Sequence, residues 1–62
     1  MADYEIRILS AGQPATVLQS YQTSDFAAIR RGHALAKTDE VVEVWRGINC
    51  VYAARHRPAP AH

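Results

Sequence analysis

The stretch Ser24-Asp-Phe-Ala-Ala-Ile-Arg-Arg-Gly-His-Ala-Leu-Ala-Lys37 decides the fold, because it is the one segment with a clear helical period. At about 100° per residue, its apolar residues gather on one arc of a helix. That arc contains Ala28, Ile29, Gly32, Leu35 and Ala36. Ser24 is suited to cap the first turn, where Asp25 also complements the helix dipole. A single helix with one apolar side predicts a sheet on which that side packs.

Four segments around the helix have the composition and alternation of strands. They are residues 4–9, 15–22, 40–46 and 50–55. Gly12 and Pro14 mark a turn between the first two, and Gly47 and Asn49 mark a turn between the last two. Alternation places these side chains toward the helix: Tyr4, Ile6, Ile8, Val17, Tyr21, Val42, Val44, Val51 and Ala53.

These elements predict an α+β domain of ββαββ order, with a four-stranded antiparallel sheet and one helix on one face. A right-handed connection through the helix places the first strand between the second and the third, which gives the strand order 2-1-3-4. We assign the domain to residues 1–55. Residues 56–62 are rich in proline and poor in large apolar side chains, and we expect them to form a flexible tail.

The chain is 62 residues long, a size at which a lone core leaves only about 3 to 5 kcal/mol of net stability. Its single cysteine, Cys50, excludes an internal disulfide. The three histidines lack the short spacing of zinc ligands, so we expect no metal and no cofactor. Self-association is then the most plausible aid to stability, and a homodimer is the expected form.

Charge and hydropathy give little indication of a partner. The formal net charge is +1, which argues against a strongly electrostatic nucleic-acid binder. No run of apolar residues approaches the roughly 20 needed for a membrane-spanning helix, and the N-terminus lacks the pattern of a secretory signal. We expect a soluble, cytoplasmic protein.

The sheet face away from the helix is predicted to carry more apolar surface than a monomer usually exposes. By strand parity it holds Arg7, Leu9, Leu18, Val41, Glu43, Trp45, Ile48, Cys50 and Tyr52. Large aromatic side chains among charges are typical of interaction sites. We therefore predict that two copies pack through this face. Scattered exposed residues, or coverage by the tail or the N-terminus, would be simpler explanations.

Binding of single-stranded nucleic acid is the alternative function. Bases would stack on Trp45 and Tyr52, as they do on other sheet platforms. The phosphates would meet Arg7, Arg46, Arg55 and Arg57. The glycine-aromatic signature of such modules is missing, and together with the weak net charge this places the alternative second.

A basic stripe is predicted on the solvent side of the helix, formed by Arg30, His33 and Lys37. Such a stripe is usually solvated, although it could dock an acidic partner. No residues form a catalytic set: Cys50 has no histidine predicted near it, the serines lack a histidine and acid pair, and no glycine-rich loop could hold a phosphate. We predict no enzyme activity.

The helix run Tyr21-Gln-Thr-Ser-Asp-Phe-Ala-Ala-Ile-Arg-Arg-Gly-His-Ala-Leu-Ala36 and the following Val41-Val-Glu-Val-Trp-Arg-Gly47 resemble small bacterial domains of unknown function. Those domains pair an alanine- and isoleucine-containing helix with a Val-Glu-Val-Trp hairpin. The resemblance spans residues 4–54 and rests on packing residues. It implies the same ββαββ fold and no particular activity. A fainter similarity to small antitoxin-type domains lacks their proline-rich strand.

Overall fold

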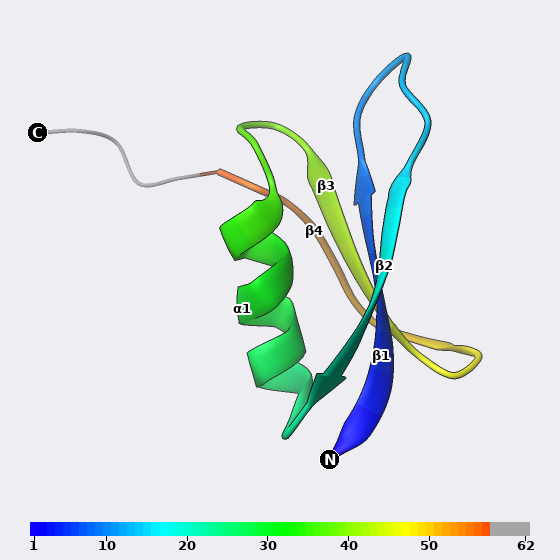
Figure 1. Cartoon of the computed structure of the whole chain (residues 1–62). Helices are drawn as coiled ribbons and strands as arrows, with labels where there is room; N and C mark the ends of the chain where they lie inside the picture. Colours follow the sequence, from blue (N-terminus) through cyan, green and yellow to red (C-terminus); the bar gives the residue numbers. More distant parts are fainter. Residues whose placement is uncertain (58–62) are drawn as a thin grey trace, which may run out of the picture.

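The computed structural model describes residues 1–57 and confirms the predicted α+β fold and strand order. Four antiparallel strands lie in the order β2-β1-β3-β4, and one helix covers one face of the sheet (Figure 1). The elements are β1 Ala2–Leu9, β2 Thr16–Gln22, α1 Asp25–Leu35, β3 Val41–Arg46 and β4 Asn49–Arg55.

The core lies between α1 and the two central strands. Its side chains come from alternate positions of β1 and β3 and from the inner side of the helix. They are Tyr4, Ile6, Ile8, Ala28, Val42 and Val44. Ile6, Val42 and Val44 have no exposed surface, because their strands are flanked on both sides and covered from above. The predicted parity of β1 and β3 is therefore confirmed.

Gly32 lets the helix approach the sheet closely. A Cβ at this position would lie 2.5 Å from Val42 Cγ1 and 3.3 Å from Ile6 Cγ2, so no side chain fits here. Glycine costs about 1 kcal/mol in a helix interior relative to alanine. That cost is offset by the contact between the helix backbone and the two central strands.

The helix begins where the sequence predicts. Ser24 Oγ accepts a hydrogen bond from the amide of Ala27 at 3.1 Å, which satisfies one free donor of the first turn. Asp25 is fixed from two sides, since its Oδ1 accepts from the hydroxyl of Tyr4 on β1 and from Arg46 at the end of β3. The first turn is thereby tied to both central strands.

From Tyr52 onward, the side chains of β4 lie on the opposite faces of the sheet from those predicted. Trp45 pairs with Cys50 as expected, but a β-bulge follows, and Val44 pairs with Tyr52 rather than with Val51. The extra residue shifts the alternation by one. Tyr52 and Ala54 therefore lie on the helix side, and the prediction that Tyr52 shares the face of Trp45 is wrong.

The predicted facing of β2 is also wrong. Leu18 pairs with Ile6 and packs against the core, so it lies on the helix side. Val17 and Tyr21 pair with Arg7 and Asp3 on the other face, where they are 52% and 59% exposed. One leucine is enough to fill the helix side of this edge strand, because the helix packs mainly over β1 and β3.

The C-terminal end of α1 is shorter than predicted, and Lys37 lies beyond the cap residue Ala36. Leu35 is 43% exposed, against the prediction of burial. His56, the first residue of the predicted tail, is held by the backbone: its amide donates to Glu40 O and its carbonyl accepts from the amide of Asp39. Arg57 follows as an exposed residue, and residues 58–62 of the predicted tail lie outside the described residues.

Candidate interaction surface

The sheet side opposite α1, here called the open face, carries side chains from all four strands. The register places them in rows across the sheet. The open face consists of Asp3, Glu5, Arg7 and Leu9 of β1, Val17, Gln19 and Tyr21 of β2, Val41, Glu43 and Trp45 of β3, and Cys50, Ala53 and Arg55 of β4. Among residues 1–57, the only helix lies on the opposite side of the sheet (Figure 1).

Charged groups at the centre of the open face lie close together, with one arginine between two glutamates. Arg7 Nε binds Glu5, and its Nη1 lies 4.0 Å from Glu43 Oε1. The Arg7 guanidinium also lies 4.4 Å from the centre of the Trp45 ring, a cation–π distance. The indole Nε1 of Trp45 donates to Glu43 Oε1 at 3.0 Å. The centre is thus an ordered network in which each charge has an opposite charge beside it.

The pKa of Glu5 reflects this network. The hydrogen bond from Arg7 holds the pKa of the Glu5 carboxyl below its usual value, against a smaller opposing effect of burial. Gln19 Nε2 adds a further hydrogen bond to Glu5 at 3.2 Å. Glu5 therefore stays ionised well into the acid range, which keeps its ion pair with Arg7 intact at neutral pH.

Apolar side chains border this charged centre on two sides. Leu9 and Val41 pair across β1 and β3, beside the Arg7 and Glu43 pair. On β2, Val17 and Tyr21 flank Gln19 and are more than half exposed. The open face combines a polar centre with apolar margins, so its apolar surface is concentrated toward the β2 edge rather than around Trp45.

Most of the predicted interface residues do lie together. Arg7, Leu9, Val41, Glu43, Trp45 and Cys50 share the open face. Leu18 and Tyr52 lie on the other face, and Ile48 is in the β3–β4 turn, where it is 91% exposed. The residues of the open face that the prediction missed are Asp3, Glu5, Val17, Gln19, Tyr21, Ala53 and Arg55, and among them Val17, Tyr21 and Ala53 were wrongly placed on the helix side. Val17, Gln19 and Tyr21 are the part on β2. The uncharged run of β2 is the sequence signal that could have pointed to them.

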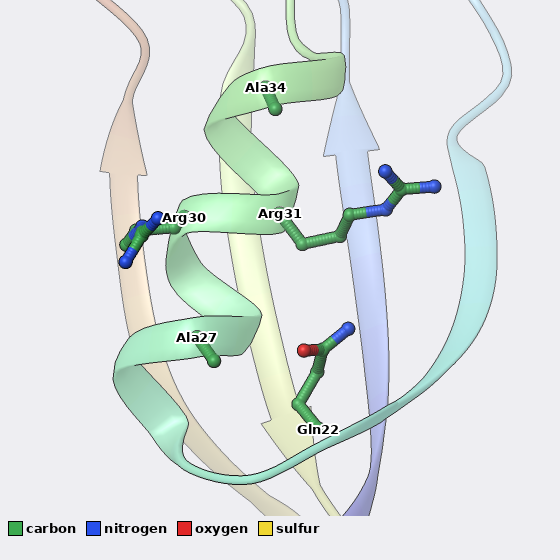
Figure 2. Close-up of a pocket in the computed structure, with 5 residues that line it drawn as sticks. All are labelled: Gln22, Ala27, Arg30, Arg31 and Ala34. Carbon is green, nitrogen blue, oxygen red and sulfur yellow. The ribbon is translucent and has the colours of Figure 1, made fainter.

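The predicted basic stripe on α1 is divided. Arg30 and Arg31 extend to opposite sides of the helix, and a shallow hollow of about 420 Å³ lies along its outer side (Figure 2). The hollow is lined by Gln22, Ala27, Arg30, Arg31 and Ala34. Lys37 lies beyond the helix, and His33 turns toward β4. The three predicted residues therefore form no continuous stripe.

His33 joins the helix to the end of β4. Its Nε2 lies 2.7 Å from the Tyr52 hydroxyl, and its Nδ1 lies 2.8 Å from Nδ1 of His56. Burial lowers the pKa of His33, and charge on His56 lowers it further. A hydrogen bond between the two Nδ1 atoms needs one to donate and the other to accept, so this contact requires at least one neutral imidazole.

Metal-ligating and thiol side chains are sparse in the part of the chain that the structure describes. No group of three metal-ligating side chains is found within residues 1–57. Cys50 is an exposed free thiol, and its Sγ contacts the backbone oxygen of Tyr52 at 3.4 Å. In the same part of the chain, no helix has the length and apolar character required to cross a bilayer.

Comparisons with protein-family models, with curated proteins and with solved structures give no match for this chain. The resemblance to small bacterial domains therefore stays a prediction that rests on the helix and hairpin residues alone.

Proposed function

We propose that this protein is a small non-enzymatic interaction module that self-associates as a homodimer through its open face. The observation that carries the proposal is a four-stranded sheet with one face covered by α1 and the other bare, at whose centre Trp45 lies partly exposed. A 62-residue chain has a small core, and a second copy on the bare face would add to the buried apolar area.

The charge network of the open face suits such an interface. Burying an unpaired charge is costly, whereas Arg7, Glu5 and Glu43 already pair within one protomer. This pairing lowers the cost of covering the three side chains, but one glutamate charge per copy has no cation of its own and has to stay hydrated in the dimer. A free, exposed cysteine is also in keeping with the reducing cytoplasm, where we place the protein.

The structure gives the nucleic-acid alternative less support than the sequence did. Tyr52 lies on the helix side, so Trp45 is left as the one stacking platform among the central strands. Arg46 is engaged by Asp25, and Arg7 is engaged by Glu5 and Trp45. Two acidic side chains beside Trp45 would also repel phosphates.

The test is solution mass across a dilution series, with Trp45 fluorescence followed in the same samples. Trp45 is the only tryptophan, so its emission reports the open face alone. We expect a dimer whose emission shifts to the red as dilution exposes the indole. Apolar association persists or tightens at high salt, whereas phosphate binding would weaken steeply.

The Trp45→Ala variant tests the centre of the face. If Trp45 is a central anchor, its truncation weakens the dimer by about 2 kcal/mol or more, which is roughly 30-fold in dissociation constant. Phe26→Ala is the matched control, because Phe26 is an aromatic residue on α1 that is 66% exposed. Both variants are measured in a Gln19→Lys chain, whose added charge on the free edge strand β2 disfavours pairing through the sheet edge. An unchanged dimer in Trp45→Ala there, or a monomer at all concentrations in the parent protein, would refute the proposal.

A further inference from the structure

The two edges of the sheet are protected to different degrees. Edge strands present unpaired backbone groups, and proteins commonly guard them with bulges, charges or proline. The β4 edge has the bulge opposite Val44 and Trp45, and it ends in Arg55. The β2 edge, Thr-Val-Leu-Gln-Ser-Tyr-Gln, runs for seven residues without a charge, a proline or a glycine. It is the edge that is open to a further strand.

We propose that β2 is a self-pairing edge, where β2 of a second copy adds antiparallel about a two-fold axis at Gln19. A strand that pairs with itself in this way brings Gln19 opposite Gln19 of the second copy. It also brings Val17 opposite the other copy's Tyr21 on the open face. On the helix side, Leu18 would meet Ser20, and Thr16 would meet Gln22. The contact joins two four-stranded sheets into one of eight strands.

The side chains of β2 are self-complementary in this register. Val17 and Tyr21 are its two exposed large apolar residues, and the axis at Gln19 places them directly opposite each other twice. Aromatic and β-branched side chains form favourable cross-strand pairs. No position of the strand is charged, so no like charges meet across the axis. This contact does not depend on the open-face association proposed above.

Single-cysteine crosslinking tests the register. In a Cys50→Ser background, Gln19→Cys places two thiols on the axis, where antiparallel partners have Cα atoms about 4.5 to 5.5 Å apart, within the range of a disulfide. In Val17→Cys alone, the two thiols of a dimer lie about 13 Å apart along the strands, because residue 17 of one copy lies opposite residue 21 of the other, four residues from the second thiol. A mixture of Val17→Cys and Tyr21→Cys brings unlike thiols together again.

We expect Gln19→Cys to crosslink at least about tenfold faster than Val17→Cys or Tyr21→Cys alone, since only its thiols meet disulfide geometry. The 1:1 mixture of the last two should recover crosslinking between unlike chains. Gln13→Cys, in the exposed β1–β2 turn, measures the rate of random collision. Equal rates at positions 13, 17, 19 and 21 would overturn the proposal.

The same experiment separates this contact from the open-face dimer. Two sheets stacked face to face lie about 10 Å apart, too far for a disulfide between the two copies of residue 19. Adding Trp45→Ala to the Gln19→Cys chain should therefore leave the crosslinking rate unchanged. A rate that falls to the collision level in the Trp45→Ala chain would mean that crosslinking depends on the open-face association, and an independent edge contact would be refuted.

Gln19→Lys gives a second test that needs no oxidation. It places two lysines opposite each other at the axis, and like charges in directly opposed positions destabilise strand pairing. We expect the edge dimer to dissociate at a concentration about tenfold higher, with Gln13→Lys as the matched control. Equal solution masses for the two variants across the dilution series would contradict the two-fold axis.

Discussion

The two faces of this sheet are built from the same strands but are stabilised by different interactions. On β3, Val44 has no exposed surface, whereas its neighbours Glu43 and Trp45 belong to the ion-pair network of the open face. The helix side contains no buried charged group among the described residues, and a single methyl group at Gly32 would not fit. Close packing defines one face, and pairing of polar groups defines the other.

This difference separates the residues that stabilise the fold from those that stay accessible on the surface. The central residues Ile6, Val42 and Val44 are fully buried against α1 within one copy. The open face keeps its charges satisfied through its own network, and its exposed apolar residues lie at the β2 margin. A change on the helix side should therefore affect folding, and a change on the open face should affect association.

The largest expected contrast comes from one substitution made on each face of β3. Val44→Ala removes two buried methyl groups and should lower the free energy of unfolding by about 2 to 3 kcal/mol, including the cavity that remains. Val41→Ala, on the open face, should cost less than about 1 kcal/mol in the monomer. Denaturant unfolding at low protein concentration measures both values.

Val44 and Val41 are the same residue type on the same strand, so the difference between the two variants measures the effect of the sheet face alone. Similar losses in the two variants would mean that the open face is already buried at that concentration. Repeating the measurement at high concentration then sharpens the result, because Val41→Ala should lose additional stability only where the open face is covered by a second copy.

Gly32→Ala is expected to lower the free energy of unfolding by about 1 to 2 kcal/mol. The added Cβ overlaps Val42 Cγ1, which costs more than the roughly 1 kcal/mol gained in helix propensity. Thermal or denaturant unfolding checks the sign. Ala34→Gly, at an exposed position of the same helix, measures the propensity difference alone.

Making Gly32→Ala in a Val42→Ala chain tests whether overlap with Val42 causes the loss of stability. Without Val42 Cγ1, the nearest remaining side-chain atom is Ile6 Cγ2 at 3.3 Å, so the cost of Gly32→Ala should fall to near zero there. A stabilising effect of Gly32→Ala in the parent chain would mean that the helix can move away from the sheet, and the close approach would not be a constraint.

The sequence predicted the covered face well, because two physical signals agree there. β1 and β3 alternate strictly, and the spacing of Ala28 and Gly32 places two small residues against them. Fold class, strand order and Ser24 as the helix cap follow from these residues. On β2, both faces carry a mixture of polar and apolar residues, and counting the apolar residues assigned the wrong face to the core. Val17 and Tyr21 outnumber Leu18, but they lie on the open face.

The bulge in β4 could not be read from the sequence. The turn at Gly47 has the predicted even length, and the pairing of Trp45 with Cys50 follows from it. The extra residue enters one position later, where Val51 and Tyr52 both fit the helix side, so no local signal marks it. That shift moves Tyr52 from the predicted interface to His33, and it explains why the site was harder to predict than the fold.

The smallest expected effect comes from the contact of His33 with Tyr52 and His56, which lies at the border of the helix-covered face. The pKa of His33 in the folded protein is lowered from 6.5 by burial and by His56. The unfolded chain therefore binds more protons than the folded one as pH falls through this range, and stability decreases. We expect the free energy of unfolding to decline from about pH 7 to pH 5.

Replacing the imidazole should reduce this decline. His33→Gln lacks this titrating group, so its unfolding free energy should decline less than that of the parent between about pH 7 and pH 5, as measured by denaturant unfolding at each pH. A second decline, below about pH 4.5, should persist in both proteins, because the pKa values of Asp25 and Glu5 are lowered in the fold by Tyr4 and Arg7. Asp25→Asn should reduce only that lower decline. An unchanged slope near neutral pH in His33→Gln would place the acid sensitivity elsewhere, and the contact among His33, Tyr52 and His56 would then have no measurable part in holding β4 to the helix.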